Sequence, residues 1–138
     1  MENTVVLTEA PLSVEAAVNQ VAGPAFGAVT TFIGMPRDNG EGHTVHRLEY
    51  QAYEAMARHK LLQILQDAQE QFALGRSYVA HRLGPVPTVE ASIVIACAAP
   101  HRAGALQAVS YVIERVKHEV PVWKKEVRTD GEFWKANC

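Results

Sequence analysis

One stretch decides how we expect this chain to fold: residues 100–126, which read PHRAGALQAVSYVIERVKHEVPVWKKE. It opens with a Pro-His-Arg turn, and apolar residues then recur at helical spacing until Pro121 ends the helix. The chain resumes as a strand over Val122–Arg128. Cationic side chains lie at both ends of the helix, a layout suited to presenting positive charge to an anion. The predicted apolar stripe comprises Ala105, Leu106, Val109, Val112, Ile113 and Val116.

Strands are expected on both sides of this helix in the sequence, where β-branched and apolar residues cluster or alternate with polar ones. Segments rich in Gly, Pro, Asp and Asn predict an exposed loop at 35–44 and a turn with two prolines at 84–88. Residues 132–138 are expected to form a short tail. The further predicted strands are Thr4–Thr8, Ala25–Gly34, His46–Ala52, Arg76–Leu83 and Val89–Ala98.

Two more helices are expected. A short one begins at Ser13, whose hydroxyl can cap it, and ends at Gly23-Pro24. A long one runs from Tyr53 to Phe72, with Leu74-Gly75 as its stop. Two long helices and strands in mixed order predict an α+β fold with a mostly antiparallel sheet, in a single domain over 1–138. The apolar stripe of the long helix comprises Met56, Leu61, Ile64, Leu65, Ala68 and Phe72.

Composition narrows the classes of partner. The formal net charge of −2 argues against broad nucleic-acid binding, which usually needs a basic face. No signal peptide and no apolar run of the ~20 residues that span a bilayer are visible, so we expect a soluble cytoplasmic protein without membrane contact. Cys97 lies in an apolar run and is expected to be a buried thiol, and Cys138 is given no role.

Patterns for several kinds of chemistry are absent. His43 and His46 are three residues apart, which on a strand or loop points them to opposite faces, so no metal site is expected. No Walker or dinucleotide-binding loop and no nucleophile elbow occurs, so no cofactor is expected. The apolar surroundings of Cys97 are expected to leave its thiol inert.

The arginines and lysines remain as candidates. Arg102 and His101 lie where a helix begins, and backbone N–H groups there already favour an anion. Arg37 lies in the polar loop. For each of these residues, solvation of an ordinary surface cation is the alternative.

Lys117 and Lys124 form a sharper pair. Lys117 lies in the last turn of the helix, and the turn at Pro121 can bring Lys124 back towards it. On a strand, Lys124 and Glu126 share one face while Lys125 points to the other. Two ammonium groups held close together lose protons more readily, which suits one of them to acid–base or nucleophilic work. Two solvated lysines are the alternative.

Helix length adds a constraint. Arg102 and Lys117 are fifteen residues apart, hence ~22 Å along a straight helix. One small ligand cannot touch both of them on the same helix. We therefore expect a homodimer in which composite sites combine residues of two chains.

Four segments, in this order and spacing, resemble the large catalytic subunit of molybdopterin synthase. The similarity covers about residues 12–135 and includes FIGMPR over 32–37, PHR over 100–102 and KHEVPVWK over 117–124. The four segments are GAVTTFIGMPRDNGEG, LEYQAYEAMA, HRLGPVPTVEASIVIACAAPHRAGAL and VKHEVPVWKKE.

This resemblance implies an α/β-hammerhead fold with a small added β subdomain. It also implies an enzyme of molybdenum cofactor biosynthesis, which converts cyclic pyranopterin monophosphate (precursor Z) to molybdopterin. Sulfur would come from the C-terminal Gly-Gly thiocarboxylate of a small ubiquitin-like subunit. The implied assembly is a heterotetramer around a homodimer of large subunits.

The resemblance also implies roles for individual residues. Lys117 and Lys124 match the two active-site lysines of the family, while its substrate-binding positions are matched by Phe32, Arg37, His101 and Arg102. Two other readings of the residues remain open. One is a non-catalytic adaptor for a ubiquitin-like tail, and the other is a binding module for a different phosphorylated metabolite.

Overall fold

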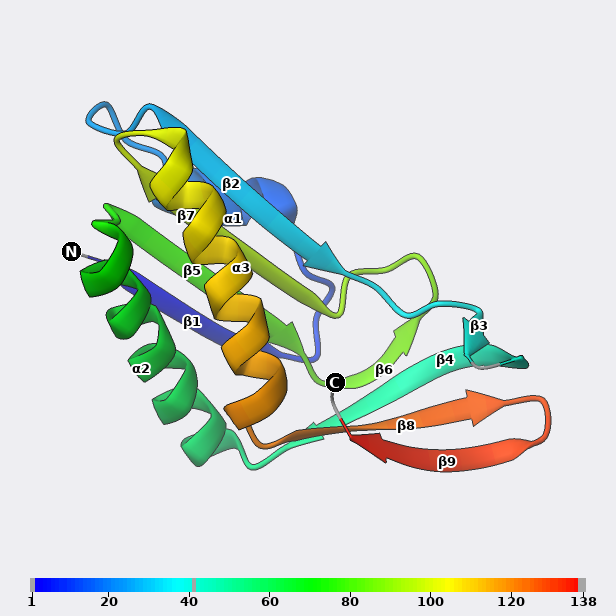
Figure 1. The fold of residues 1–138 in the computed structure, drawn as a ribbon. Coiled ribbons are helices and arrows are strands. Elements are labelled where there is room, and N and C mark those ends of the chain that lie inside the picture. Colours follow the sequence, from blue (N-terminus) through cyan, green and yellow to red (C-terminus); the bar gives the residue numbers. More distant parts are fainter. Residues whose placement is uncertain (1, 41, 137–138) are drawn as a thin grey trace.

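The computed structural model describes residues 2–40 and 42–136, which form three helices and nine strands (Figure 1). The helices are α1 (Val14–Val21), α2 (Glu54–Phe72) and α3 (Arg102–Glu119). The strands are β1 (Asn3–Thr8), β2 (Ala28–Gly34), β3 (Asn39–Gly40), β4 (His43–Ala52), β5 (Arg76–Arg82), β6 (Gly84–Pro87), β7 (Ile93–Ala99), β8 (Val122–Arg128) and β9 (Gly131–Ala136).

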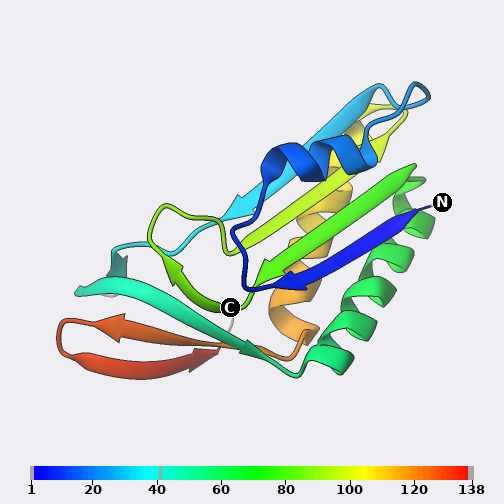
Figure 2. The ribbon, with the colours of Figure 1, turned by 180° about the vertical axis from the view of Figure 1, so that it is seen from behind.

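The strands are arranged in two sheets. The first has the order β1-β5-β7-β2, and in the second β3, β4, β8 and β9 follow one another while β6 also pairs with β4. Helices α2 and α3 cover one face of the first sheet, and α1 lies on the opposite face (Figures 1 and 2). Among the described strands, only β1 and β5 pair in parallel. The predicted α+β class, the mostly antiparallel pairing and the two long helices are confirmed.

The larger cluster of buried hydrophobic residues lies between the two long helices and the first sheet, because the apolar stripes of these helices face the sheet. A smaller cluster lies between α1 and the opposite face of this sheet. Most of the predicted stripe residues are buried, but Met56 and Leu106 are 57% and 55% exposed. Their assignment to the buried stripes was wrong. The fully buried Ala57 and Ala108 lie on the buried sides of α2 and α3 instead.

The start of α1 agrees with the prediction from the sequence, and the end of α2 differs from it. The Ser13 hydroxyl accepts a hydrogen bond from the backbone N–H of Ala16 at 3.0 Å, which caps α1 as predicted. The left-handed residue that ends α2 is Ala73, with φ 52°, and not Gly75. Gly75 meets a different demand, since a Cβ there would overlap the ring of Phe26.

Three segments expected to be irregular contain strands. Residues 39–40 within the expected loop form β3, residues 84–87 form β6 against β4, and residues 131–136 form β9 against β8. Two expected strands begin later than predicted, β2 at Ala28 and β7 at Ile93. Cys138 lies outside the described residues. None of the described helices is both long and apolar enough for a bilayer crossing.

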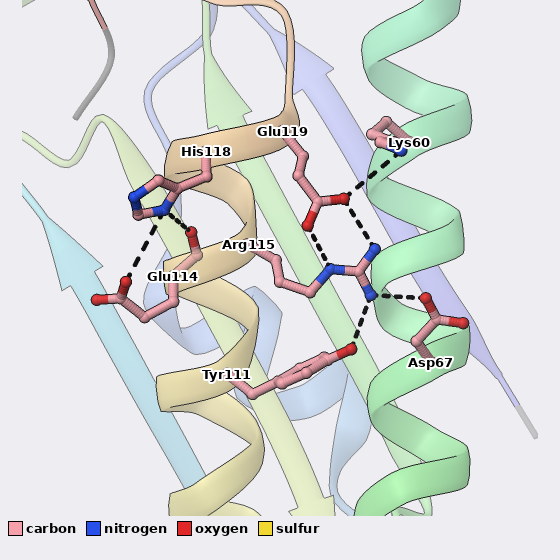
Figure 3. Close-up of polar contacts among 7 residues, drawn as sticks. All are labelled: Lys60, Asp67, Tyr111, Glu114, Arg115, His118 and Glu119. Atoms are coloured by element: carbon pink, nitrogen blue, oxygen red, sulfur yellow. Dashed lines mark hydrogen bonds and ion pairs between the residues drawn. The ribbon is translucent and has the colours of Figure 1, made fainter.

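A cluster of charged side chains fixes the last turns of α3 against α2 (Figure 3). Arg115 on α3 donates hydrogen bonds to Asp67 on α2 at 2.6 Å and to the Tyr111 hydroxyl at 2.7 Å. It also donates to Glu119 at 2.7 Å, and Glu119 lies 3.5 Å from the ammonium of Lys60 on α2. The end of α3 therefore has a defined position relative to the rest of the fold.

Candidate active site

A cavity of about 560 Å³ lies where the end of α3 meets the second sheet. Its walls come from the end of β2 and the loop after it, from β4, β5 and β7, and from α3 and β8. This volume is in the range of small-molecule binding sites. Segments far apart in the sequence therefore meet at one site.

Both candidate lysines line this cavity. Lys117 shares a face of α3 with Ile113 and Val116, which line it too, because residues three and four apart lie on the same side of a helix. Lys124 and Glu126 reach the cavity from β8. The structure thus confirms the strand alternation predicted for this segment and the approach of both lysines to one space.

Lys125 points to the other face of β8, as predicted. Its ammonium lies 3.4 Å from Glu49 and 2.9 Å from Glu132, and it also lies over the ring of Trp134. Neighbouring lysines in the sequence are therefore in different surroundings. Lys124 faces the cavity, and Lys125 belongs to a surface ion-pair network.

Phe32 and Arg37 line the cavity from the end of β2 and the loop that follows. At Gly34 an added Cβ would lie 2.7 Å from Cγ2 of Ile93, so this position needs a glycine for β2 to lie close to β7. Ser92 also fixes the position of Gly34, because its N–H and its hydroxyl both donate hydrogen bonds to the Gly34 carbonyl, at 2.8 and 3.1 Å. The loop that carries Arg37 thus departs from a fixed point.

Three polar residues that the sequence analysis did not select also line the cavity: Tyr50, His81 and Ser92. His81 is 2% exposed, and its Nδ1 lies 3.0 Å from the Arg82 carbonyl oxygen. Burial lowers the pKa of His81 to about 4, helped by the positive charge of Lys117 and opposed by the hydrogen bond to Arg82. Its imidazole is therefore uncharged at neutral pH.

Tyr50 is also neutral in this site. Burial raises the pKa of its hydroxyl, and a hydrogen bond with Ser92 offsets only part of that effect. Tyr50 lies directly opposite Lys124 in the pairing of β4 with β8, so their side chains are on the same face of the sheet. Its strand alternation was predicted correctly, but no pattern in the sequence linked it to the lysines.

The charges of the cavity favour an anion. Arg37, Lys117 and Lys124 contribute three cations, against the single carboxylate of Glu126 among the lining residues. That carboxylate is itself 3.6 Å from the guanidinium of Arg128. A phosphate or carboxylate group entering the cavity would meet a net positive field.

His101 and Arg102 do not line this cavity. They are exposed at the N-terminal end of α3, ~22 Å along the helix axis from Lys117. The structure therefore brings together four of the six predicted site residues, Phe32, Arg37, Lys117 and Lys124, within one chain. The other two face solvent at the far end of the same helix.

The remaining candidates are accounted for structurally. Within the described ranges, no group of three or more His, Cys, Asp or Glu residues is placed to hold a metal ion. His43 lies 3.6 Å from Asp130, and His46 contacts the Thr129 hydroxyl at 3.2 Å. Cys97 is a buried free thiol, as predicted, and burial raises its pKa to about 12.

A family model described as the MoaE protein matches residues 7–119. The molybdopterin synthase catalytic subunit of Oryza sativa subsp. indica is 52% identical over 120 residues, which are 87% of this chain and 62% of that protein. This chain thus spans less than two thirds of the rice relative. The molybdopterin synthase catalytic subunit of Bacillus subtilis (strain 168) is 42% identical over 128 residues, 93% of this chain and 82% of that protein.

A solved structure is similar over almost the whole chain. The X-ray crystal structure of molybdopterin synthase from Staphylococcus aureus superposes with a TM-score of 0.91 at 35% identity, covering 94% of this chain and 95% of that one. This similarity confirms the fold class predicted from the sequence, a mixed α+β fold, here with two sheets.

Proposed function

Because the chain belongs to the MoaE family, whose relatives are named molybdopterin synthase catalytic subunits, we propose that it transfers sulfur to a pterin phosphate in the cytoplasm. Its substrate is cyclic pyranopterin monophosphate (precursor Z), and its product is molybdopterin. The sulfur donor is the C-terminal Gly-Gly thiocarboxylate of a small ubiquitin-like subunit. The observation that carries the proposal is the convergence of Arg37, Lys117 and Lys124 on one cavity, since the phosphate and the thiocarboxylate are both anions.

Each cation has a separate role in this proposal. Lys117 receives the thiocarboxylate and stabilises charge as the thiocarboxylate sulfur attacks the side chain of the pterin. Water then cleaves the resulting thioester, which leaves the sulfur on the pterin and a carboxylate on the small subunit. Lys124 gives or takes a proton while the cyclic phosphate opens. Arg37 holds the phosphate, because a guanidinium can donate two parallel hydrogen bonds to it. Phe32 offers an aromatic surface to the pterin ring.

The second phosphate contact comes from another copy of the chain. His101 and Arg102 are too far from Lys117 along α3 to serve the same cavity. A homodimer solves this, because the phosphate end of one α3 can complete the cavity of the partner. With one small subunit on each large subunit, the assembly is a heterotetramer.

Product formation tests this function. The purified chain is incubated with a thiocarboxylated small subunit and precursor Z, and the dithiolene product is measured. We expect product in proportion to the thiocarboxylate consumed. Tight binding of the small subunit without any product would support the adaptor reading and contradict the proposal.

The second alternative gives a different result in the same experiment. A binding module for another phosphorylated metabolite would bind neither the small subunit nor precursor Z and would form no dithiolene. The cavity favours the enzyme over this alternative. It contains two lysines, and phosphate binding alone does not require the second one.

A further inference from the structure

His81 occupies an unusual place for a histidine: it is almost fully buried on β5, yet its side chain lines the cavity that contains Lys117. Its Nδ1 lies 3.0 Å from the carbonyl oxygen of Arg82. A carbonyl oxygen can only accept, so Nδ1 carries the proton of the neutral ring. Nε2 therefore keeps its lone pair and is an acceptor.

The surroundings hold this ring in one orientation. The ring of Tyr50 packs edge-on against it with centroids 4.9 Å apart and an interplanar angle of 68°. The Tyr50 hydroxyl is hydrogen-bonded to Ser92, and the Ser92 hydroxyl donates to the Gly34 carbonyl. These contacts, from β4, from the residue before β7 and from the end of β2, support the imidazole from one side.

Lys117 is the cation whose charge acts on this ring, adding to burial in lowering the pKa of His81 to about 4. The other charged side chains that line the cavity are Arg37, Lys124 and Glu126. A lysine ammonium group has three N–H donors at the end of a flexible side chain, so the side chain alone does not fix the direction of its N–H bonds. An uncharged acceptor nearby can fix that direction without repelling the ammonium.

We propose that His81 is a positioning residue for Lys117: its Nε2 accepts a hydrogen bond from the Lys117 ammonium and directs the remaining N–H bonds of that group at the anion in the cavity. This inference rests on the proposed function, since it gives Lys117 an anion to meet. It also explains why a neutral, buried histidine lies beside a cationic site. A protonated His81 would repel Lys117.

The tautomer of His81 can be determined by NMR, without an activity assay. In the protein labelled with ¹⁵N-histidine, we expect the His81 ring at neutral pH to carry its proton on Nδ1 and to have an unprotonated Nε2. The His81→Gln variant assigns the resonances. Lys117→Ala should shift the Nε2 resonance, because it removes the donor. A proton on Nε2, or an Nε2 resonance unchanged in Lys117→Ala, overturns the inference.

Kinetics provide the second test. His81→Leu keeps the approximate size but removes the acceptor, and we expect the kcat for dithiolene formation to fall about 10–100-fold with little change in KM for precursor Z. His81→Gln restores an acceptor, and so it should recover much of the lost turnover.

The results of these experiments distinguish a failure of the proposed role of His81 from a failure of the proposed function. An active wild type together with a His81→Leu variant of unchanged kcat contradicts the role of His81 but not the proposed function. Equal losses in the Leu and Gln variants indicate a structural role and also contradict it. If the wild type forms no dithiolene, the proposed function fails, and the NMR result still decides whether His81 contacts Lys117.

Discussion

Arg102 and Lys117 lie on one helix but at its opposite ends, ~22 Å apart, and only Lys117 lines the cavity. Both residues belong to the proposed chemistry. Both residues belong to one continuous helix, whose rise per residue keeps its two ends apart. The proposed chemistry therefore needs two chains for one complete site.

Mixing two inactive variants tests this requirement. Arg102→Ala and Lys117→Ala should each lose turnover as homodimers. In a mixed dimer, the cavity of the Arg102→Ala chain keeps its own Lys117 and receives Arg102 from the partner. About half the dimers in an equal mixture are mixed and each has one intact site, so about a quarter of wild-type activity should return.

The matched control for the mixture is Arg102→Ala combined with a chain carrying both substitutions. No dimer in that mixture contains an intact site, and it should stay inactive. Failure of the first mixture to recover activity, with mixed dimers shown to form, contradicts the composite site.

The Arg115 cluster should contribute to stability. We expect Arg115→Ala to lower the free energy of unfolding by about 1–2 kcal/mol, because it breaks charged hydrogen bonds to Asp67 and Glu119 that are only partly exposed to water. The control is Arg47→Ala, whose partner Glu49 lies 2.9 Å away on the sheet surface. Arg47 is more exposed than Arg115, at 44% against 20%, and its substitution should cost at most ~0.5 kcal/mol. Equal effects in urea unfolding would contradict this assignment.

The same cluster predicts a pH dependence. Hydrogen bonding to Arg115 lowers the pKa of Glu119 from its ordinary 4.5 to about 2. A carboxyl with a lowered folded pKa stabilises the protein above its unfolded pKa and loses that contribution as pH falls through the folded value. The stability difference between the wild type and Arg115→Ala should therefore narrow as pH falls from about 4.5 towards 2. A difference that widens over this range would show that Glu119 is not the partner.

Val89 lies at the rim of the cavity with a positive φ of 62° and is 85% exposed. The left-handed conformation costs a β-branched residue about 1–2 kcal/mol, whereas asparagine tolerates it better. Val89→Asn should therefore raise the free energy of unfolding by about 1 kcal/mol. Thr88→Asn, at a neighbouring position without a positive φ, should bring no such gain. A less stable Val89→Asn would contradict the strain at this position.

The sequence predicted the helices and most strands because their hydrophobic periods are local. It missed β6 because prolines usually mark turns, but Pro85 and Pro87 occupy a short strand that pairs only with β4 among the described strands. A strand at an edge tolerates residues without an N–H. It missed β9 because nothing local indicates that Phe133 packs on the Arg128 guanidinium, 3.7 Å from the ring centroid.

The same limit applies to the site. Lys117 and Lys124 could be selected from the sequence because a single turn connects them. They converge because Lys117 lies at the end of α3 and Lys124 near the start of β8. His81 is a long way from Lys117 in the sequence, and only the fold brings the end of β5 to the same cavity as α3 and β8. No spacing rule covers such a contact. Conversely, the sequence correctly predicted that His101 and Arg102 lie at the start of a helix. The predicted length of that helix was enough to show that they are far from Lys117.

The most direct measurement is dithiolene formation by Lys117→Ala with a thiocarboxylated small subunit and precursor Z, with precursor Z binding measured on the same sample. Lys125→Ala is the control, because Lys125 lies on the opposite face of β8 and should leave turnover unchanged. The account predicts that Lys117→Ala still binds precursor Z but loses about 10²–10³-fold in kcat. Full turnover by Lys117→Ala would contradict it.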